Sequence, residues 1–532
     1  MVGTRTVVAS LAPPRPADAG LGGAARHGVT NLLGVAVAAI AGFGLNVVVT
    51  RNWSKVDAGL FFTTTSAFMI LYAAARLGTG VGSVYFISRY RTLGQPQRIR
   101  ASVLVALVPV LLVGTVLAAV GWWAAPELVA LTSAEPVDGA VPALRAVLLF
   151  VPVAALCDFA LAACRGFGRM RPLLLIERVG RTGLQLLGVS LAALLGLSAA
   201  TALPLTWAAP YLPAGLIALI WLARLVRRAE RAAAGPTGTP ATAGPTGTDR
   251  RVGFREEFGV YWRYTGPRAL TSLGQMAVQR MDIVLLGTMR GLADAATYTA
   301  ATRFLALGQL SGQALSTAVQ HRLAEHLVRD DRAGAGRLYQ AATGWLVLLA
   351  WPTYLLFATF AEPVLAIFGA EYLAGRSVTV YLALTMLVAT GCGMVDTVLN
   401  MAGRTAWTFY NALVGTLVNL VLNLLLIPPY GIMGAAVAWS ASILISNLVP
   451  LAQLFWAYRL HPFGRGTLTA AGLAVVCYGL PPLLARPVFG DGLPVLAAVA
   501  LVGTLGYAAL VWRFRRALQL DALRTLRRGR RR

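Results

Sequence analysis

Long runs of apolar residues, separated by short polar gaps, recur along most of this 532-residue chain. Each run holds roughly 20 residues or more, enough for a helix to cross the roughly 30 Å hydrocarbon core of a bilayer. Backbone groups find no water partners in lipid, so such runs must fold as helices. The pattern predicts about fourteen transmembrane helices, over residues 29–50, 59–87, 102–125, 141–164, 173–197, 203–224, 262–287, 298–320, 338–361, 377–399, 407–427, 432–457, 467–485 and 493–513.

The composition agrees with a chain that has little water-facing surface. Hydrophobic residues make up 57% of the chain, charged residues 13%, and the mean hydropathy is +0.67. A soluble domain carries about 25% charged residues. The sequence therefore predicts an all-α polytopic membrane protein and argues against a water-soluble globule.

Basic residues gather in every second gap between the apolar runs. Lys55 is the only lysine among the 46 basic residues, and the formal net charge is +25. Loops rich in arginine stay in the cytoplasm, so an even number of spans with both termini cytoplasmic is predicted. The opposite gaps contain only five basic residues, Arg51, Lys55, Arg290, Arg376 and Arg486. The gaps assigned to the cytoplasm contain many more: Arg89, Arg91, Arg98, Arg100, Arg165, Arg169, Arg171, the run from Arg224 to Arg263, Arg322, Arg329, Arg332, Arg337, Arg404, Arg459 and Arg465. This distribution indicates membrane topology and not nucleic-acid binding, and the arginine preference suggests a GC-rich bacterium, hence its cytoplasmic membrane.

A low-complexity segment, GPTGTPATAGPTGTD at residues 235–249, divides the chain after the sixth span. Its glycine, proline and threonine content is typical of a flexible linker. The predicted organisation is a cytoplasmic tail before an uncleaved signal anchor (1–28), an N-lobe of six helices (29–226), a cytoplasmic linker (227–258), a C-lobe of six helices (259–460), two further helices (461–513) and a basic cytoplasmic tail (514–532).

The two lobes contain related sequences after their first helices. RNWSKVDAGLF (51–61) follows the first span and RGLADAATY (290–298) follows the seventh, and each places an aspartate, Asp57 or Asp294, before small residues. With six spans per lobe, duplication predicts a pseudo-twofold axis along the membrane normal and a central cavity between the lobes. The alternative is that two apolar hairpins share loop chemistry by chance.

Several charged residues fall within the predicted spans, where insertion costs at least about 2.5–3.5 kcal/mol each. Asp158 lies at a depth that suits an ion pair with Arg178 or Arg181, which share a helix face. Asp282 and Arg303 lie at equal depth and suit a salt bridge within a helical hairpin. Each of these pairs is interpreted either as structural or as part of a cavity.

Three arginines, Arg76, Arg268 and Arg280, have no obvious acidic partner nearby in the sequence. Guanidinium groups in a wet cavity would suit an anionic substrate, most simply a phosphate or pyrophosphate. The alternative is that each reaches the membrane surface from a helix end.

No signature of catalysis is found. No outer loop pairs two acidic residues as a sugar-transferring enzyme requires, and no P-loop is present. The four cysteines (Cys157, Cys164, Cys392 and Cys477) lie in or at the ends of apolar runs, with no CxxC spacing and no nearby histidine. We therefore expect no enzyme activity, no metal site and no cofactor.

The stretch NALVGTLVNLVLNLLLIPPYGIMGAAVAWSAS, residues 411–442, resembles the signature of bacterial polysaccharide (Wzx-like) flippases of the multidrug/oligosaccharidyl-lipid/polysaccharide exporter superfamily. The matching residues are Asn411, Asn419, Asn423, Ile427, Pro428, Tyr430, Gly431, Gly434, Ala435 and Ala436. DIVLLG (282–287), residues 298–303, EPVLAIFGAEY (362–372) and DAGLF (57–61) are similar to the same family, so the resemblance extends from about residue 28 to 460. The three asparagines can bond across helices, with substrate contact as the alternative.

The resemblance implies alternating access between two six-helix lobes, moving a polyprenyl-(pyro)phosphate-linked oligosaccharide across the cytoplasmic membrane for cell-surface polysaccharide export. It also implies membrane lipids as surroundings, and a polysaccharide polymerase and glycosyltransferases of the same pathway as partners. By analogy with lipid II flippases, the last two helices could form a groove for the lipid tail.

Three alternatives are kept. A multidrug exporter of the same superfamily often has a carboxylate in the first span, which this chain lacks. A lipid II-type peptidoglycan precursor flippase shares the expected extra helix pair. A membrane glycosyltransferase or polymerase is disfavoured by the missing acidic pair.

Overall fold

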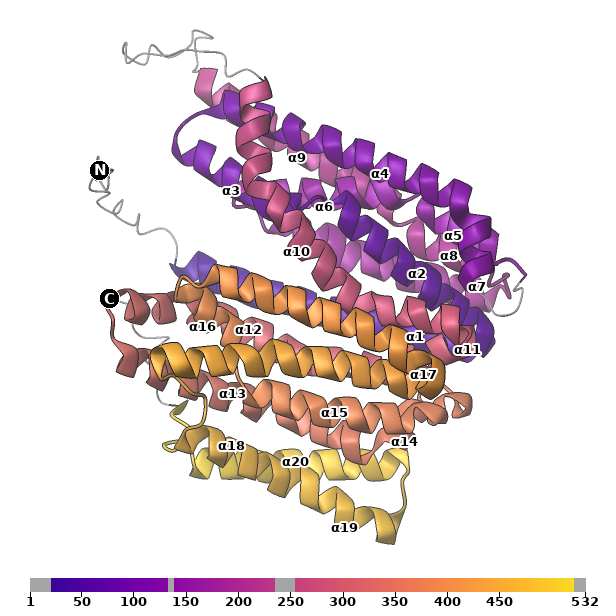
Figure 1. Cartoon of the computed structure of the whole chain (residues 1–532), viewed down its shortest axis with the longest axis vertical. Coiled ribbons are helices and arrows are strands. Elements are labelled where there is room, and N and C mark those ends of the chain that lie inside the picture. The colour runs from indigo at the N-terminus through magenta and orange to yellow at the C-terminus, as the bar shows by residue number, and fades with distance from the viewer. Residues whose placement is uncertain (1–20, 133–137, 235–253, 521–532) are drawn as a thin grey trace.

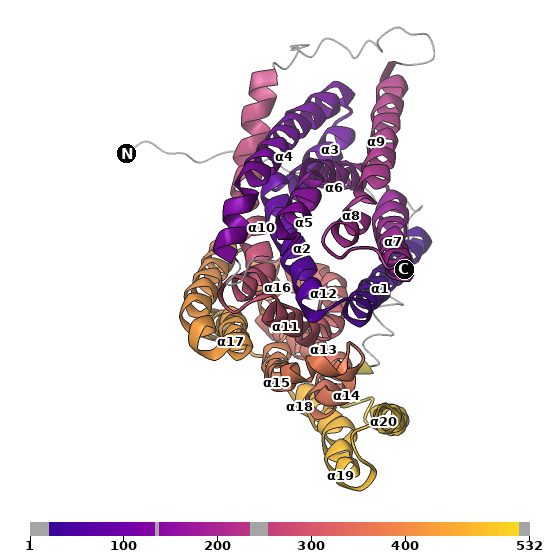
Figure 2. The same cartoon turned by 90° about the vertical axis from the view of Figure 1, so that its right-hand side faces the viewer.

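A computed structural model describes residues 21–132, 138–234 and 254–520, in which every regular element is helical. Two bundles of long helices lie side by side, and a separate hairpin flanks the second bundle (Figures 1 and 2). The fold-class prediction is confirmed. Most of the predicted N-terminal tail and linker, and the end of the C-terminal tail, lie outside the described residues.

The first bundle contains the helices before the linker. They are α1 (Leu21–Asn52), α2 (Lys55–Ala75), α3 (Thr79–Thr92), α4 (Pro96–Thr132), α5 (Ala140–Leu148), α6 (Val151–Gly166), the π-helix η1 (Leu173–Arg181), α7 (Thr182–Leu194), α8 (Ala202–Ala208) and α9 (Tyr211–Ala234). Buried aromatic residues fill its centre, where Phe68 packs edge-on against Trp207 at a centroid distance of 5.3 Å.

The second bundle and the hairpin follow the linker. Their helices are α10 (Phe254–Met289), α11 (Leu292–Arg303), α12 (Leu305–Val328), α13 (Arg332–Thr359), α14 (Ala361–Ala366), the 3₁₀ turn η2 (Ala370–Gly375), α15 (Arg376–Gly391), α16 (Val395–Met401), α17 (Thr405–Tyr458), α18 (Arg465–Ala474), the π-helix η3 (Val475–Gly479), α19 (Leu480–Phe489) and α20 (Leu493–Arg513). The hairpin, α18 to α20, packs mainly on α13.

Ten helical stretches of the described chain are long and apolar enough to cross a membrane. One of them, Ala406–Tyr458, holds two predicted spans that are joined at Gly431, whose backbone (φ 55°, ψ −130°) is not helical. The predicted spans 173–197, 262–287 and 298–320 are also helical but do not meet this criterion. These less apolar spans contain most of the charges predicted inside the membrane, which suits helices that face a polar interior.

One predicted span is interrupted where it touches a second helix, the continuous α10, beside a proline. The second predicted span breaks between α2 and α3, where Leu77 and Gly78 have φ of +51° and +71°. A β-carbon at Gly78 would lie 2.7 Å from the backbone nitrogen of Ala269, next to Pro267 in α10. Proline removes a helical hydrogen bond and bends its helix. The break in one span therefore fits against the bend in another, within the membrane.

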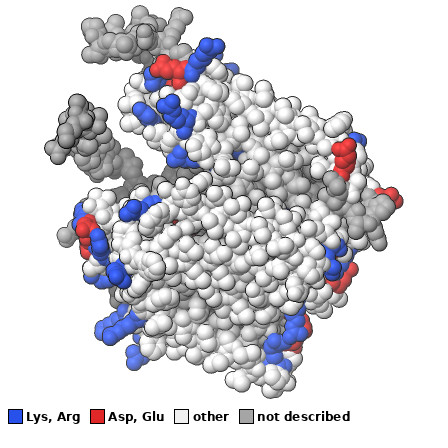
Figure 3. All heavy atoms as spheres, viewed as in Figure 1, with Lys and Arg blue, Asp and Glu red and all other residues white. Residues whose placement is uncertain are grey.

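The two bundles diverge toward the end at which α1 begins and α3 ends (Figure 1). Charged residues gather at the two ends of the helices, and a wide uncharged band lies between them (Figure 3). A band of this kind is expected where hydrocarbon covers the protein. The surface in Figure 3 is hollowed between the bundles at the divergent end.

Candidate functional site

The break in the second span turns Arg76 toward the interior of the first bundle. Arg76 is the last residue before the two left-handed positions and follows directly on α2. Its guanidinium lies over the Tyr72 ring at 5.1 Å, and its Nη1 lies 3.5 Å from Oδ2 of Asp158 in α6. Arg76 therefore has an acidic partner 82 residues away, which corrects the expectation that it lacks one.

Asp158 does not pair with Arg178 or Arg181, as the sequence had suggested. Arg181 lies 3.8 Å from Glu177 and donates hydrogen bonds to Gln185 and to the Tyr211 hydroxyl, both at 3.2 Å. The π-helix η1 carries both Arg178 and Arg181, and its wider turn changes the faces on which they lie. Helical spacing therefore misplaced both arginines relative to Asp158.

Gln185 and Tyr211 complete this network and were not identified from the sequence. Gln185 is 4% exposed and donates to the carbonyl of Trp207 at 2.8 Å. Gln185 follows Arg181 by one helical turn, and this spacing could have identified it from the sequence as a neighbour of Arg181. Arg178 lies nearby on η1, and its buried Nε has no hydrogen-bond partner within the described ranges.

Replacing Asp158 by alanine should lower the free energy of unfolding by about 2 kcal/mol, because it leaves the partly buried Arg76 charge without its partner. The midpoint of thermal unfolding in detergent is the measurement. Asp158→Leu combined with Arg76→Met should regain most of the loss. An unchanged midpoint in Asp158→Ala would argue against a stabilising pair.

In the second bundle, Asp282 of α10 is 3% exposed, and its carboxylate is bound by Tyr298 and not by the expected Arg303. The hydroxyl of Tyr298 donates to its Oδ2 at 2.6 Å, and the backbone N–H of Ile283 donates to its Oδ1 at 3.0 Å. The predicted Asp282–Arg303 salt bridge is not formed. Tyr298 lies more than one helical turn before Arg303 on α11, and at that position its hydroxyl binds the Asp282 carboxylate in place of the Arg303 guanidinium.

Arg303 lies instead over the ring of Phe62, a residue of the first bundle, at 5.8 Å. Arg280 and Arg303 lie close enough to repel each other, and both are attracted to Asp282. The Nε atom of each arginine is buried and has no hydrogen-bond partner among the described residues. Both guanidinium groups are therefore attracted to one carboxylate without forming an ion pair with it, and that carboxylate is already bound by Tyr298.

Arg268, the third cationic candidate, is bound to its own helix. Its Nη1 donates to the carbonyl of Tyr264 at 2.7 Å, and its guanidinium lies 3.9 Å from the centre of the Tyr264 ring. Among Arg76, Arg268 and Arg280, only Arg280 thus lacks a specific hydrogen-bond partner among the described residues.

Asn411, Asn419 and Asn423, the asparagines of the family resemblance, lie on α17 inside the second bundle. Asn411 and Gln453 exchange hydrogen bonds of 2.8 and 3.1 Å, which join the two halves of α17. The Asn423 amide donates to the carbonyl of Asn419 at 2.9 Å. Asn419 is fully buried, and its side-chain nitrogen and oxygen have no hydrogen-bond partner in the part of the chain that the structure describes.

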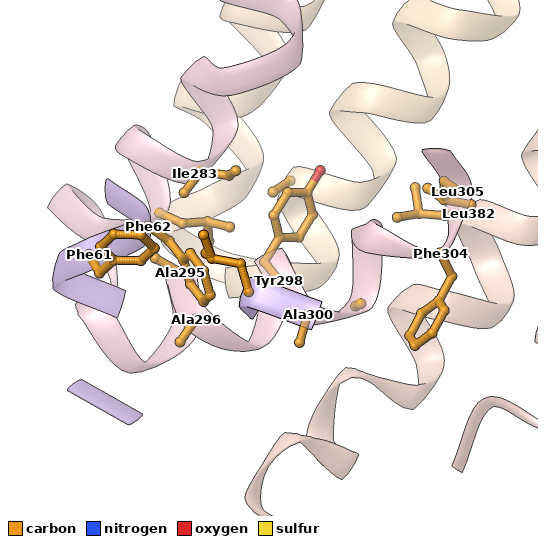
Figure 4. Close-up of a cluster of buried hydrophobic side chains, with 14 of the residues drawn as sticks. Phe61, Phe62, Ile283, Ala295, Ala296, Tyr298, Ala300, Phe304, Leu305 and Leu382 are labelled. Atoms are coloured by element: carbon orange, nitrogen blue, oxygen red, sulfur yellow. The ribbon is translucent and has the colours of Figure 1, made fainter. Parts of the chain in front are cut away.

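The bundles meet at the end opposite the divergence. Figure 4 shows Phe61 and Phe62 of α2 among Ile283 of α10 and Ala295 and Ala296 of α11, and all five are at most 3% exposed. This cluster separates the Arg280–Arg303 pair from that end of the molecule.

Two contacts beside this cluster hold the bundles together. A β-carbon built on Gly59 would overlap the carbonyl of Leu292, so α2 and α11 touch through backbone atoms. Nε of Arg51, at the end of α1, donates to the carbonyl of Ile367 after α14 at 2.8 Å. The closed end is therefore held by close packing and by a hydrogen bond from one bundle to the other.

In the comparisons with known proteins, a single family pattern matches each half of the chain. The pattern that defines the MatE family matches residues 32–194 and 267–425. The probable multidrug resistance protein NorM of Burkholderia pseudomallei is 29% identical over 259 residues, or 47% of this chain and 55% of that protein. The probable low-salt glycan biosynthesis flippase Agl15 of Haloferax volcanii is 21% identical over 228 residues, or 42% of this chain and 48% of that protein. The chain thus spans about half the length of the curated relatives it matches.

Solved structures share the fold over more of the chain. The lipid II flippase MurJ in an inward closed conformation superposes with a TM-score of 0.69 at 14% identity, covering 92% of this chain and 99% of that one. An inward-facing multidrug resistance MATE family transporter of the MOP superfamily gives a TM-score of 0.60 at 16% identity, covering 78% and 93%. Since the family pattern matches more than half of the residues, one match in each half, this multi-pass membrane protein belongs to the MatE family.

Proposed function

We propose that this protein is a flippase that moves a polyprenyl-(pyro)phosphate-linked oligosaccharide across the bacterial cytoplasmic membrane by alternating access. The observation that carries the proposal is the pair Arg280 and Arg303. These two partly buried guanidinium groups are attracted to a single carboxylate that Tyr298 already binds, and their Nε donors have no partner among the described residues. Guanidinium groups bind phosphate through paired hydrogen bonds, and a low-dielectric site strengthens the attraction.

The arrangement of the bundles supports alternating access. They diverge at one end and are closed at the other by Phe61, Phe62 and the Gly59–Leu292 contact. We propose that residues 29–226 and 259–460 move as two lobes, and that the divergent end, with both termini, faces the cytoplasm. The arginine-rich gaps support this orientation. The bend at Pro267 and the break at Gly78 are places where such a motion can be accommodated.

A groove in the C-terminal hairpin suits the lipid part of such a substrate. A cavity of about 590 Å³ lies between η3–α19 and α20, with Pro481, Phe489, Val495 and Val502 in its almost wholly apolar lining. We propose that the polyprenyl chain lies along this hairpin while the phosphate reaches the two arginines. The polymerase and glycosyltransferases of the same pathway are the proposed partners.

Proteoliposomes that contain the purified full chain provide the test. A fluorescent polyprenyl-pyrophosphoryl oligosaccharide is placed in one leaflet, and its appearance in the other is followed with a membrane-impermeant quencher. We expect transfer several-fold faster than in protein-free vesicles, and no acceleration for a matched polyprenyl glycoside without phosphate. Equal rates with and without protein would contradict the proposal.

A multidrug exporter is the second candidate, favoured by the similarity to NorM. The same vesicles, loaded with a cationic dye, separate the two. Dye efflux without lipid transfer would establish the exporter. A cationic drug is poorly matched to a site with two partly buried arginines, and α1 contains no carboxylate. Transfer of a peptidoglycan precursor but of no other glycan would identify a lipid II-type flippase.

A further inference from the structure

A second basic site lies outside the Arg280–Arg303 pair, in a groove between α3 and α10. Its volume is about 620 Å³, and its lining includes Arg89, Arg255, Arg263 and Glu256. The groove opens where α3 ends and α10 begins, the end at which basic residues gather over the first part of α10 in Figure 3. Three guanidinium groups and one carboxylate leave its lining with an excess of positive charge.

The basic groups of the groove are free to bind a ligand. Arg89, Arg255 and Arg263 are exposed, and none of them pairs with Glu256 or with any other acidic residue in the described ranges. Exposed arginines on neighbouring helices repel one another unless an anion lies between them. A phosphate group would accept hydrogen bonds from more than one of them.

The walls of the groove are held rigidly. The Tyr90 hydroxyl of α3 donates to Oε1 of Glu257 at 2.6 Å, and Ser83 bonds to Tyr261 at 3.0 Å. The rings of Tyr85 and Tyr264 stack at a centroid distance of 4.4 Å. These contacts join α3 to the first half of α10, so the groove exists before any ligand binds.

The rest of the lining is apolar and faces outward. Tyr85 is 41% exposed and Val260 is 46% exposed, and Val81, one turn deeper than Tyr85 on α3, is 51% exposed. Tyr85 and Val81, which lies just beyond the lining, are on the membrane side of Arg89 along α3, and Val260 lies between Arg255 and Arg263 on α10. A free phosphate ion would gain nothing from them, whereas the acyl chains of a lipid would cover them.

We propose that this groove binds the phosphate headgroup of an anionic membrane phospholipid, with Arg89, Arg255 and Arg263 around the phosphate and the acyl chains against Val260 and Val81. Basic pockets between transmembrane helices on the cytoplasmic side are suited to such headgroups. The site does not depend on which cargo the protein moves. Because it lies on the part of α10 before Pro267, bound lipid would brace that part against the first bundle.

Gly259 makes a sharp test possible. It lines the groove, and a β-carbon there would meet no other atom within 4 Å. Gly259→Leu should therefore fill the groove without disturbing the protein. Gly266 on the same helix is equally open but does not line the groove, so Gly266→Leu is the matched control.

The experiment titrates phosphatidylglycerol against the full chain in detergent and counts bound lipids by native mass spectrometry. We expect at least about tenfold tighter binding of phosphatidylglycerol than of phosphatidylcholine. Gly259→Leu and the double variant Arg89→Gln/Arg263→Gln should each weaken phosphatidylglycerol binding about tenfold, whereas Gly266→Leu should bind like the wild type.

Two results would overturn the proposal. One is unchanged phosphatidylglycerol binding in both Gly259→Leu and the double arginine variant, with unfolding midpoints like that of the wild type. The other is complete displacement of the lipid by inorganic pyrophosphate together with equal binding of phosphatidylcholine, which would assign the groove to soluble phosphates. Neither result bears on the translocation assay, so this proposal and the proposed function can fail separately.

Discussion

Leucine in place of Gly59 is expected to stop transport, because the two bundles can then no longer close at the end where they meet. The backbone of α2 at Gly59 touches the carbonyl of Leu292 in α11, and even one added carbon would overlap it. Close-packed backbones cannot yield without moving apart. The variant should remain folded, since the two bundles can separate, but it should stay open at this end.

Two measurements check this expectation. Transfer of the pyrophosphate-linked oligosaccharide should fall below about a tenth of the wild-type rate, as expected when a required closure is lost. Spin labels at the exposed positions Ser198 and Glu371, one in each bundle, should report a longer distance in Gly59→Leu. Gly472→Leu, at a glycine with no atom near its β-carbon position, is the control. Wild-type transport by Gly59→Leu would show that this contact is not part of the cycle.

Replacement of Arg280 or Arg303 by glutamine should weaken substrate binding about 10- to 100-fold, because one hydrogen bond to a charged group contributes about 1.5–3 kcal/mol. Stability should not fall, and should rise slightly, since each substitution relieves the repulsion between two partly buried cations. A loss of transport together with a gain in thermal stability is the signature of a binding residue and not of a structural one.

The measurement is the dependence of the transfer rate on substrate concentration. Arg280→Lys should keep part of the affinity, because the charge remains while the paired hydrogen bonds are lost. Arg145→Gln is the matched control, since Arg145 is bound to the Trp122 carbonyl at 3.1 Å and lies over the Trp122 ring. Normal transfer by Arg280→Gln, Arg303→Gln and the double variant would exclude the pair from the substrate site.

The fold could be predicted in outline from the sequence because hydrophobicity acts locally. A run of apolar residues must form a helix in lipid whatever lies beside it, so the fourteen ranges could be read one at a time. The local breaks within the helices could not be predicted from the sequence in the same way. Gly78 and Pro267 are ordinary residues for a loop or a bent helix, and only the structure shows that Gly78 packs against Thr265, Arg268 and Ala269 on either side of this proline.

The partners of the buried charges could be predicted only in part. Asp158 was assigned to Arg178 or Arg181 from depth and helix spacing, but η1 is a π-helix and Arg76 reaches Asp158 through the broken second span. Asp282 was assigned to Arg303, but Tyr298 occupies it. Depth along a span can be counted from the sequence, whereas the direction in which a side chain points depends on local irregularities of the helix.

The sequence by itself determined an all-helical membrane chain with two related halves, and it singled out the set of charges within the spans. These properties depend on composition and on the order of apolar and polar residues along the chain, and both can be read directly from the sequence. Only the tertiary structure decided that Arg76 pairs with Asp158, that Arg280 and Arg303 are attracted to one carboxylate, and that Gly59 of α2 touches the Leu292 carbonyl of α11. Whether a buried charge is free or paired depends on atoms a few ångströms away, and these come from residues far apart in the chain.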